Sequence, residues 1–158
     1  MLYLWMGLYA AGIVALDQLT KYLTVANIEQ FGKVPVIDGL FHLTYVQNTG
    51  AAFSSFSGAR WLFVALFLVF AALAIWELVK KKLPFTKLER WCIISILAGG
   101  LGNVIDRVYL GYVIDMIEVE FVDFAVFNVA DSFITCGCIL LMVSLVFFNK
   151  KFWKEEKK

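Results

Sequence analysis

The chain has 158 residues, of which 61% are hydrophobic and 17% charged, and its mean hydropathy is +0.79. Soluble globular domains are about half apolar, so this composition excludes an ordinary soluble domain and predicts one membrane domain over residues 1–158. The net charge of +1 comes without a basic face, so no nucleic-acid partner is expected.

Four long apolar segments dominate the chain, at residues 2–25, 60–79, 91–110 and 127–148. Each is long enough to cross the ~30 Å hydrocarbon core of a bilayer as a helix. The first segment lacks a basic start and an evident cleavage sequence, so we expect an uncleaved span and not a signal peptide. The sequence therefore predicts an all-α integral membrane protein with four transmembrane helices.

Residues 27–58 differ in character from these segments and are predicted to be strand-rich. Apolar and polar residues alternate over 41–46, and Asp38-Gly39 is a typical turn. The region ends in Asn48-Thr49-Gly50-Ala51-Ala52-Phe53-Ser54, whose small residues allow the backbone to approach a ligand closely. A plain loop is the alternative for this stretch.

Histidine and cysteine offer little for metal chemistry. His42 is the only histidine, and on an alternating strand we expect it at the surface. Without a second histidine, neither a zinc site nor a Ser-His pair has support. Cys92, Cys136 and Cys138 lie inside apolar segments and are interpreted as small core residues. We therefore expect no metal and no cofactor.

Basic residues gather in two places. Five of the fourteen lie within 80–90 and another five within 150–158. Because cytoplasmic loops are rich in Lys and Arg, this distribution predicts that both termini are cytoplasmic and that the two long loops lie outside.

With this topology, polar residues from distant segments meet at the outer face of the membrane. In the last span, Asn128, Asp131, Ser132 and Thr135 form one polar stripe on a helix. A hydrogen-bonded seam between helices is the alternative for the stripe. The residues brought to one level are Asp17, Lys21, Asn48, Asn103, Asp106, Arg107, Asp115, Asn128 and Asp131.

These charged residues require an explanation, because placing each charged side chain near hydrocarbon costs up to about 2.5–3.5 kcal/mol of free energy. Carboxylates without histidine or cysteine at the same depth suggest an aspartic dyad, in which two aspartates share one proton. One carboxylate takes a proton from water, and the other hydrogen-bonds the amide carbonyl under attack. Four aspartates are candidates, at 17, 106, 115 and 131, and the residue types alone do not choose the pair.

Two other interpretations compete with a peptidase. Intramembrane carboxylates also mark ion paths, so a small transporter or proton relay is one alternative. A relay needs polar groups across the whole bilayer, whereas segments such as 62–70 and 139–148 are almost wholly apolar. A purely structural membrane subunit explains the helices but not the convergence of polar groups.

Five motifs in order closely resemble the bacterial lipoprotein signal peptidases, the type II signal peptidase family, over nearly the whole chain. They are Asp17-Gln18-Leu19-Thr20-Lys21, the stretch 48–54 quoted above, Gly99-Gly100-Leu101-Gly102-Asn103-Val104-Ile105-Asp106-Arg107, Gly111-Tyr112-Val113-Ile114-Asp115 and Phe127-Asn128-Val129-Ala130-Asp131-Ser132. One departure is Met116, where the family commonly has phenylalanine, which puts the local packing in question.

The resemblance implies four transmembrane helices with a small extracytoplasmic β-cradle, in the bacterial cytoplasmic membrane. It implies a metal-independent aspartic endopeptidase, active at the outer leaflet face, that cuts lipid-modified prolipoproteins before the diacylglyceryl-modified cysteine. Membrane lipid and cyclic-peptide inhibitors such as globomycin are the other implied partners.

Residue roles are carried over from the family by motif. The implied catalytic pair is Asp115 and Asp131, and Asp17, Lys21 and Asp106 match supporting positions. The implied substrate- and inhibitor-binding residues are Asn48, Gly50, Asn103, Arg107, Asn128 and Ala130. The acidic, aromatic loop after Asp115, with its charges at 118, 120 and 123, is left without an assigned role.

Overall fold

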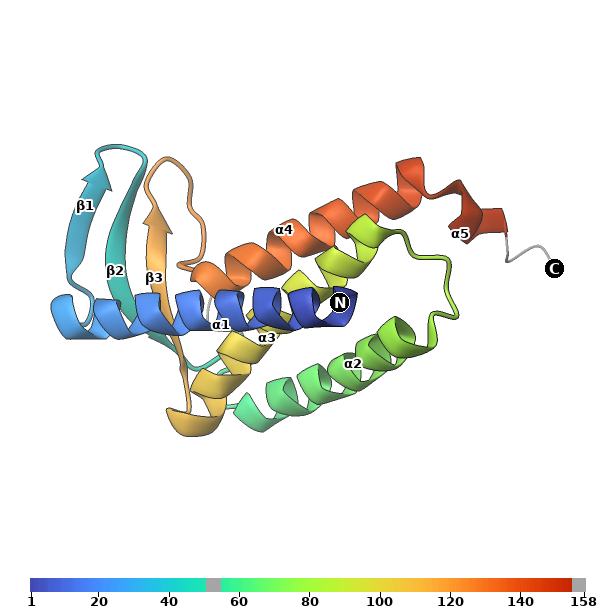
Figure 1. Ribbon diagram of the computed structural model, residues 1–158. Helices are drawn as coiled ribbons and strands as arrows, with labels where there is room; N and C mark the ends of the chain where they lie inside the picture. The colour runs from blue at the N-terminus through green and yellow to red at the C-terminus, as the bar shows by residue number, and fades with distance from the viewer. Residues whose placement is uncertain (51–54, 155–158) are drawn as a thin grey trace.

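The computed structural model describes residues 1–50 and 55–154, so four residues of the stretch 48–54 and the end of the basic tail lie outside the described residues. The chain is mainly helical, with a small sheet at one end of the helices (Figure 1). The elements are α1 (Leu2–Asn27), β1 (Lys33–Ile37), β2 (Phe41–Asn48), α2 (Arg60–Lys80), α3 (Lys87–Tyr109), β3 (Val113–Val119), α4 (Val129–Val143), the π-helical segment η2 (Ser144–Phe148) and α5 (Lys150–Lys154).

Three of the helical stretches are long and apolar enough to cross a membrane: Arg60–Lys80, Lys87–Tyr109 and Val129–Phe148. Large apolar side chains of α2, such as Leu62, Leu66 and Val69, are more than half exposed. Such a continuous apolar surface is unfavourable in water and suits lipid. Together these features describe a multi-pass membrane protein.

Helix ends differ from the predicted bounds where capping residues decide them. α3 begins at Lys87 and not at 91, because Thr86 and Glu89 form a reciprocal capping box. α4 begins at Val129 behind a second such box, made by Asn128 and Asp131. The segment 80–90, predicted as a loop, is therefore helical at both ends.

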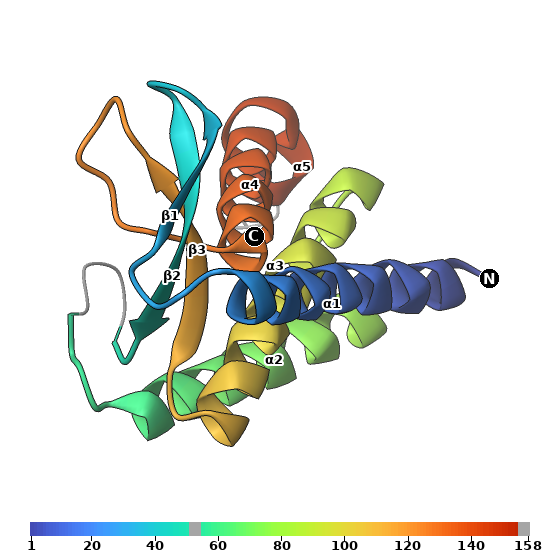
Figure 2. The ribbon, with the colours of Figure 1, turned by 90° about the vertical axis from the view of Figure 1, so that its left-hand side faces the viewer.

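The sheet has three antiparallel strands in the order β1-β2-β3, and it stands beside α1 and the start of α4 (Figure 2). The predicted turn joins β1 to β2, and Gly39 adopts a φ of 72°, which favours glycine. The third strand was missed by the sequence analysis, which assigned its second half to an acidic loop. Residues Val113–Val119 pair with β2 and therefore form a strand and not a loop.

His42 is not at the surface, contrary to the sequence prediction. It is 6% exposed, and its two ring nitrogens lie 2.6 Å from Glu118 Oε2 and 2.8 Å from Glu120 Oε1. Lys33 Nζ lies 2.9 Å from the other oxygen of Glu118. Although burial opposes its ionisation, the hydrogen bonds from Lys33 and His42 lower the pKa of Glu118. Glu118 in β3 and Glu120 just after it therefore bind β3 to side chains of β1 and β2.

Helix α3 lies between α1, α2 and α4, and glycines allow its close approach to two of them. A Cβ at Gly99 would lie 2.5 Å from the carbonyl oxygen of Ala130 in α4. A Cβ at Gly102 would lie 2.5 Å from the Asp17 carboxylate in α1. Neither position has room for a side chain, so these two glycines set the spacing of the helices that carry the site.

At the end of the bundle remote from the sheet, Glu89 ties three segments together. Its side chain is fully buried and accepts hydrogen bonds from Thr86 N, Ser144 Oγ and Asn149 Nδ2, each at 2.7 Å. One carboxylate therefore caps α3 and joins it to η2 and to the residue before α5. A buried charge of this kind is tolerated because its oxygens are satisfied.

We expect Glu89→Ala to lower the free energy of unfolding by roughly 2–4 kcal/mol, because it leaves buried donors without an acceptor. Thermal unfolding of the purified protein measures the change. Glu29→Ala, at an exposed position in the α1–β1 connection, is the control and should leave the midpoint unchanged. Equal midpoints for Glu89→Ala and the control would contradict the role given to this carboxylate.

Candidate functional site

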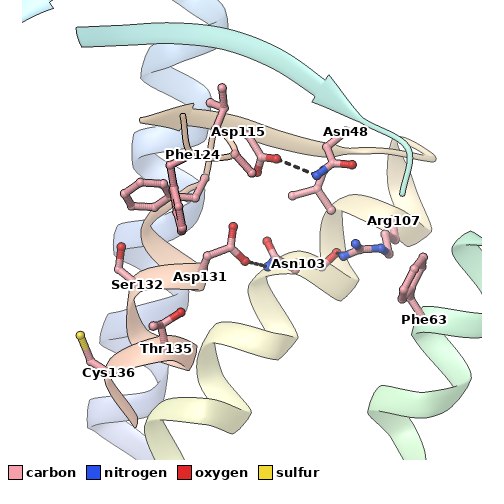
Figure 3. A pocket seen from close by; sticks show the side chains of 14 residues that line it. Asn48, Phe63, Asn103, Arg107, Asp115, Phe124, Asp131, Ser132, Thr135 and Cys136 are labelled. Carbon is pink, nitrogen blue, oxygen red and sulfur yellow. Dashed lines mark hydrogen bonds between the residues drawn. The ribbon is translucent and has the colours of Figure 1, made fainter. Parts of the chain in front are cut away.

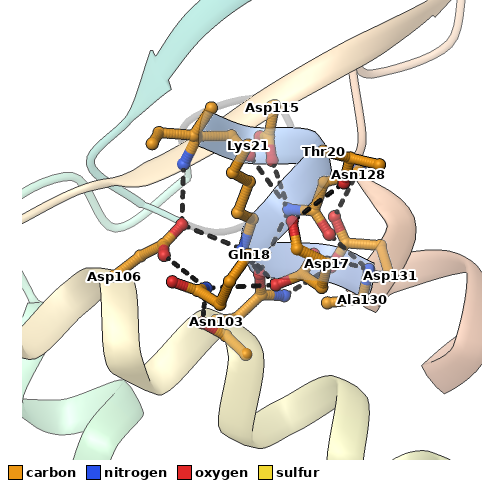
Figure 4. A network of polar contacts seen from close by, with 12 residues as sticks. Asp17, Gln18, Thr20, Lys21, Asn103, Asp106, Asp115, Asn128, Ala130 and Asp131 are labelled. Carbon is orange, nitrogen blue, oxygen red and sulfur yellow. Dashed lines mark hydrogen bonds and ion pairs between the residues drawn. The ribbon is translucent and has the colours of Figure 1, made fainter. Parts of the chain in front are cut away.

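A buried lysine lies at the centre of the polar residues that the sequence motifs contribute (Figure 4). Lys21 is 1% exposed, and its ammonium group lies 2.9 Å from Asp17 Oδ2, 2.9 Å from Asp106 Oδ2 and 3.0 Å from Asn103 Oδ1. All three of its N–H donors have acceptors. An ammonium group without them would be very costly at this depth, so α1 and α3 are held in one relative position.

The two carboxylates that neutralise Lys21 also bind the backbone of other elements. Asp17 Oδ1 accepts from Ala130 N, at the start of α4, at 3.0 Å. Asp106 Oδ2 accepts from Ile114 N, in β3, at 3.1 Å, and Gln18 donates to Asp106 Oδ1 at 3.0 Å. A carboxylate at a helix N-terminus is favoured by the helix dipole and by the free N–H groups. Asp17 and Asp106 thus connect Lys21 to α4 and to β3 and fix these elements relative to the ammonium group.

Two asparagines connect this centre to the remaining aspartates. Asn103 Oδ1 accepts from Lys21, while its amide nitrogen donates to Asp131 Oδ1 at 2.7 Å. Asn128 is fully buried, and its amide nitrogen donates to Asp115 Oδ1 at 2.7 Å and to Asn103 Oδ1 at 3.1 Å. Because the Asn103 oxygen faces a cation, its amide orientation is determined and its N–H group must face Asp131.

Asp131 is held by the start of its own helix. Asn128 Oδ1 accepts from Asp131 N at 2.9 Å, and Asp131 Oδ2 accepts from Asn128 N at 3.2 Å. The capping box that begins α4 therefore also orients this carboxylate. Among the described residues, Asp131 Oδ2 accepts only from a backbone N–H and Oδ1 only from the Asn103 amide.

Asp115 projects from β3 toward the same space. Its Oδ2 accepts from Asn48 Nδ2 at 2.9 Å, and Asn48 lies on the neighbouring strand β2, opposite Val113. Burial raises the pKa of Asp115 to about 7, with the Asp131 charge adding to the rise and the Asn48 and Asn128 hydrogen bonds opposing it. A carboxyl group with this pKa is partly protonated at neutral pH.

Arg107 lies at the edge of the site and holds the backbone after β2. Its Nη2 donates to the carbonyl of Gly50 at 2.9 Å, and Gly50 N donates to Asn48 Oδ1 at 2.9 Å. The guanidinium group also lies 4.9 Å from the ring centre of Phe63 in α2. Arg107 and Gly50 thus position Asn48, which in turn contacts Asp115.

Asp115 and Asp131 face a cavity of about 600 Å³ between β3, α3 and α4 (Figure 3). Asn48, Asn103 and Arg107 also line it, whereas Asp17 and Asp106 do not. The cavity continues along α4 past Ser132, Thr135 and Cys136 and is otherwise bordered by apolar residues, including Phe63 and Phe124. It therefore has two carboxyl groups at one end and a largely apolar channel leading away from them.

The structure brings all eleven sequence-derived site residues into one connected network. Gln18, Phe63 and Phe124 are contributors that the sequence analysis did not name as site residues. Gln18 lay inside a quoted motif, but nothing in the sequence marked the two phenylalanines. Cys136 is exposed and borders the cavity, so its interpretation as a core residue is wrong. Met116 is 2% exposed and packs with Tyr45 and Ile114, so it fills its position in the core of the sheet.

Among the residues that the structure describes, no group of three or more His, Cys, Asp or Glu side chains is arranged to hold a metal ion. The carboxylates of the site are instead bound by amide, ammonium and backbone donors.

Comparison with known proteins relates this chain to one family. Residues 9–147 match the family described as signal peptidase (SPase) II. The chain is 44% identical over 147 residues to a lipoprotein signal peptidase of Streptococcus thermophilus (strain CNRZ 1066), covering 91% of this chain and 89% of that protein. It is 45% identical over 145 residues to a lipoprotein signal peptidase of Streptococcus pyogenes serotype M1, covering 91% and 90%.

Two solved structures share the fold, and both are described as bacterial membrane enzymes studied by the in meso method. One, at 2.3 Å resolution, is similar with a TM-score of 0.86 at 30% identity, covering 92% of this chain and 90% of that chain. The other, at 1.9 Å resolution, has a TM-score of 0.82 at 31% identity, covering 91% and 94%. With the family match over most of its length, the chain belongs to the signal peptidase II family.

Proposed function

We propose that this protein is an aspartic endopeptidase that removes signal peptides from lipid-modified prolipoproteins, cutting before the diacylglyceryl-modified cysteine. The relatives named lipoprotein signal peptidase support the substrate class. One observation supports the aspartic chemistry above all others: of the four aspartates, only Asp115 and Asp131 line the cavity. Asp17 and Asp106 are both bound to Lys21.

This division among the aspartates assigns their roles. Asp17 and Asp106 each form an ion pair with Lys21 at 2.9 Å, and neither lines the cavity. Asp115 and Asp131 accept hydrogen bonds from neutral donors and form no ion pair with the described residues. They are therefore the pair suited to share a proton and exchange it with a substrate.

In the proposed reaction, Asp115 carries the shared proton and Asp131 begins as the carboxylate. Asp131 takes a proton from a water molecule as its oxygen attacks the carbonyl carbon of the scissile amide. Asp115 gives its proton to the carbonyl oxygen, producing a tetrahedral diol. The proton held by Asp131 then passes to the amide nitrogen, the C–N bond breaks, and Asp115 recovers its proton as the carbonyl re-forms.

The remaining site residues bind substrate or support the pair. We assign Asn48, Gly50, Asn103, Arg107, Asn128 and Ala130 to substrate and inhibitor binding, and Asp17, Lys21 and Asp106 to support. Because Arg107 already binds Gly50, its contribution is to hold the backbone that contacts substrate. The apolar length of the cavity suits a signal peptide, a lipid chain or a cyclic peptide such as globomycin.

The proposed topology adds α1 as a fourth span, within a single domain of residues 1–158. Its 26 residues would extend about 39 Å at helical rise, and 2–16 carry no charge. With the basic segments cytoplasmic, the termini lie inside and the sheet and aspartates lie at the outer leaflet of the bacterial cytoplasmic membrane.

We expect Asp115→Asn and Asp131→Asn each to reduce cleavage of a lipidated prolipoprotein at least about 10²–10⁴-fold, because asparagine cannot exchange the proton. Both variants should still bind globomycin, and the parent should cleave in EDTA. Asp38→Asn, in the exposed β1–β2 turn, is the control and should keep full activity. A folded Asp115→Asn or Asp131→Asn protein that cleaved at the parent rate would remove that residue from the pair.

The pKa of Asp115 predicts the pH dependence. Since the proposed acid must be protonated, kcat/KM should fall as pH rises above about 7. Asn48→Ala removes a hydrogen-bond donor that favours the ionised form of Asp115, so the apparent pKa of the pair should rise. The pH at which kcat/KM falls should then be higher by about one unit. Gln47→Ala is the control, because Gln47 donates to Tyr45 and not to Asp115. If kcat/KM fell at a lower pH in Asn48→Ala than in the parent, Asp115 could not be the residue that carries the shared proton.

Topology can be measured by cysteine labelling in intact cells, with Cys92, Cys136 and Cys138 first replaced. An impermeant reagent should label Asp38→Cys from outside but should label Lys82→Cys only after permeabilisation. Labelling of Lys82→Cys in intact cells would show that the basic segment between α2 and α3 is not cytoplasmic.

A further inference from the structure

A second cavity, of about 210 Å³, lies at the end of the bundle remote from the sheet. It is formed where the start of α1, the end of α2 and the start of α3 meet. Met6, Leu78 and Phe85 give it apolar walls, and Lys81, Lys87 and Arg90 contribute three cationic groups. We call this the basic cavity. None of its residues belongs to the site with the two aspartates.

In the described part of the chain, the three cations form no ion pair, because none of them lies within ion-pair distance of a carboxylate. Of the neighbouring acids, Glu89 binds Ser144 and Asn149. Glu77 Oε1 accepts from Leu83 N, and Glu77 Oε2 is buried without a hydrogen-bond partner among the described residues, but Glu77 does not line the cavity. A buried nitrogen of Arg90, Nη1, has no hydrogen-bond partner in the described part of the chain. The described lining of the basic cavity thus contains three cationic side chains and no carboxylate.

The surroundings of the basic cavity indicate which anion fits. Tyr3, at its edge, is more than half exposed, as are the neighbouring Leu4, Val79 and Leu88. Further exposed apolar side chains lie on α1 and α2, including Leu8, Leu73 and Ile75. An anion held here would have apolar groups directly beside it, which favours an anionic group that carries hydrocarbon chains over a free ion.

We propose that the basic cavity binds the phosphate of an anionic phospholipid, with the acyl chains along the exposed apolar faces of α1 and α2. Basic pockets between transmembrane helices near a membrane surface are suited to such headgroups. Placing the lipid in the cytoplasmic leaflet rests on the proposed topology, whereas the binding itself does not. The lipid would hold three helix ends together at the side opposite the aspartates.

Native mass spectrometry of the purified full chain in detergent tests this directly. Phosphatidylglycerol and phosphatidylcholine with the same acyl chains are the probes, and the parent should prefer phosphatidylglycerol. Lys81→Gln, Lys87→Gln and Arg90→Gln should each weaken that preference about fivefold. Arg90→Lys should keep most of it, because it keeps the charge. Lys82→Gln is the matched control, since Lys82 lies over Trp76 and does not line the cavity.

The lipid-binding measurements can contradict the proposal in several ways. Equal binding of both lipids by the parent, or an equal loss in Lys82→Gln, would overturn the proposal. Displacement of phosphatidylglycerol by inorganic phosphate at matching concentration would show that the cavity recognises a free anion and would overturn the assignment to lipid. Cleavage of prolipoprotein by the same variants should persist, so failure here leaves the proposed peptidase function untouched.

Discussion

The structure depends on one buried ammonium group. Lys21 is withdrawn from solvent and receives three acceptors from two helices, Asp17, Asp106 and Asn103. Removing one acceptor would leave a charge unbalanced where solvent cannot compensate, which typically costs several kcal/mol. Its two carboxylates also bind backbone N–H groups of α4 and β3. The cation therefore determines where four elements of the fold meet.

In this arrangement, the aspartates that neutralise Lys21 are different from the aspartates that face the cavity. Asp17 and Asp106 form the ion pairs with Lys21. Asp115 and Asp131 accept hydrogen bonds from neutral donors and line the cavity. Asn103 and Asn128 lie between the two groups, and each contacts both a cavity aspartate and the network around Lys21. Gly102 permits this because any side chain there would meet the Asp17 carboxylate. Rigid positioning of the two carboxyl groups thus arises from contacts that do not themselves exchange protons.

Local signals in the chain predicted much of this fold. Long apolar runs indicated the helices, and alternation with Asp38-Gly39 indicated the β1–β2 hairpin. Helix bounds were less accurate, because the capping boxes at Thr86 and Asn128 decide them and not the apolar pattern. The third strand was missed because its acidic residues resembled a loop. The end of β3 becomes favourable only when Glu118, in the strand, and Glu120, just after it, contact His42 of β2, which is distant in the sequence.

By itself, the sequence determined the membrane class, the hairpin and the set of polar residues that had to share one depth, since burying charge in hydrocarbon demands partners. It left four aspartates chemically equivalent. The family resemblance implied which pair is catalytic but gave no physical reason. The tertiary structure distinguishes the surroundings of the four aspartates: Lys21 faces two, and a cavity with amide donors faces the other two. The position of His42 and the burial of Met116 were decided in the same way, by neighbours distant in the chain whose identity no local pattern records.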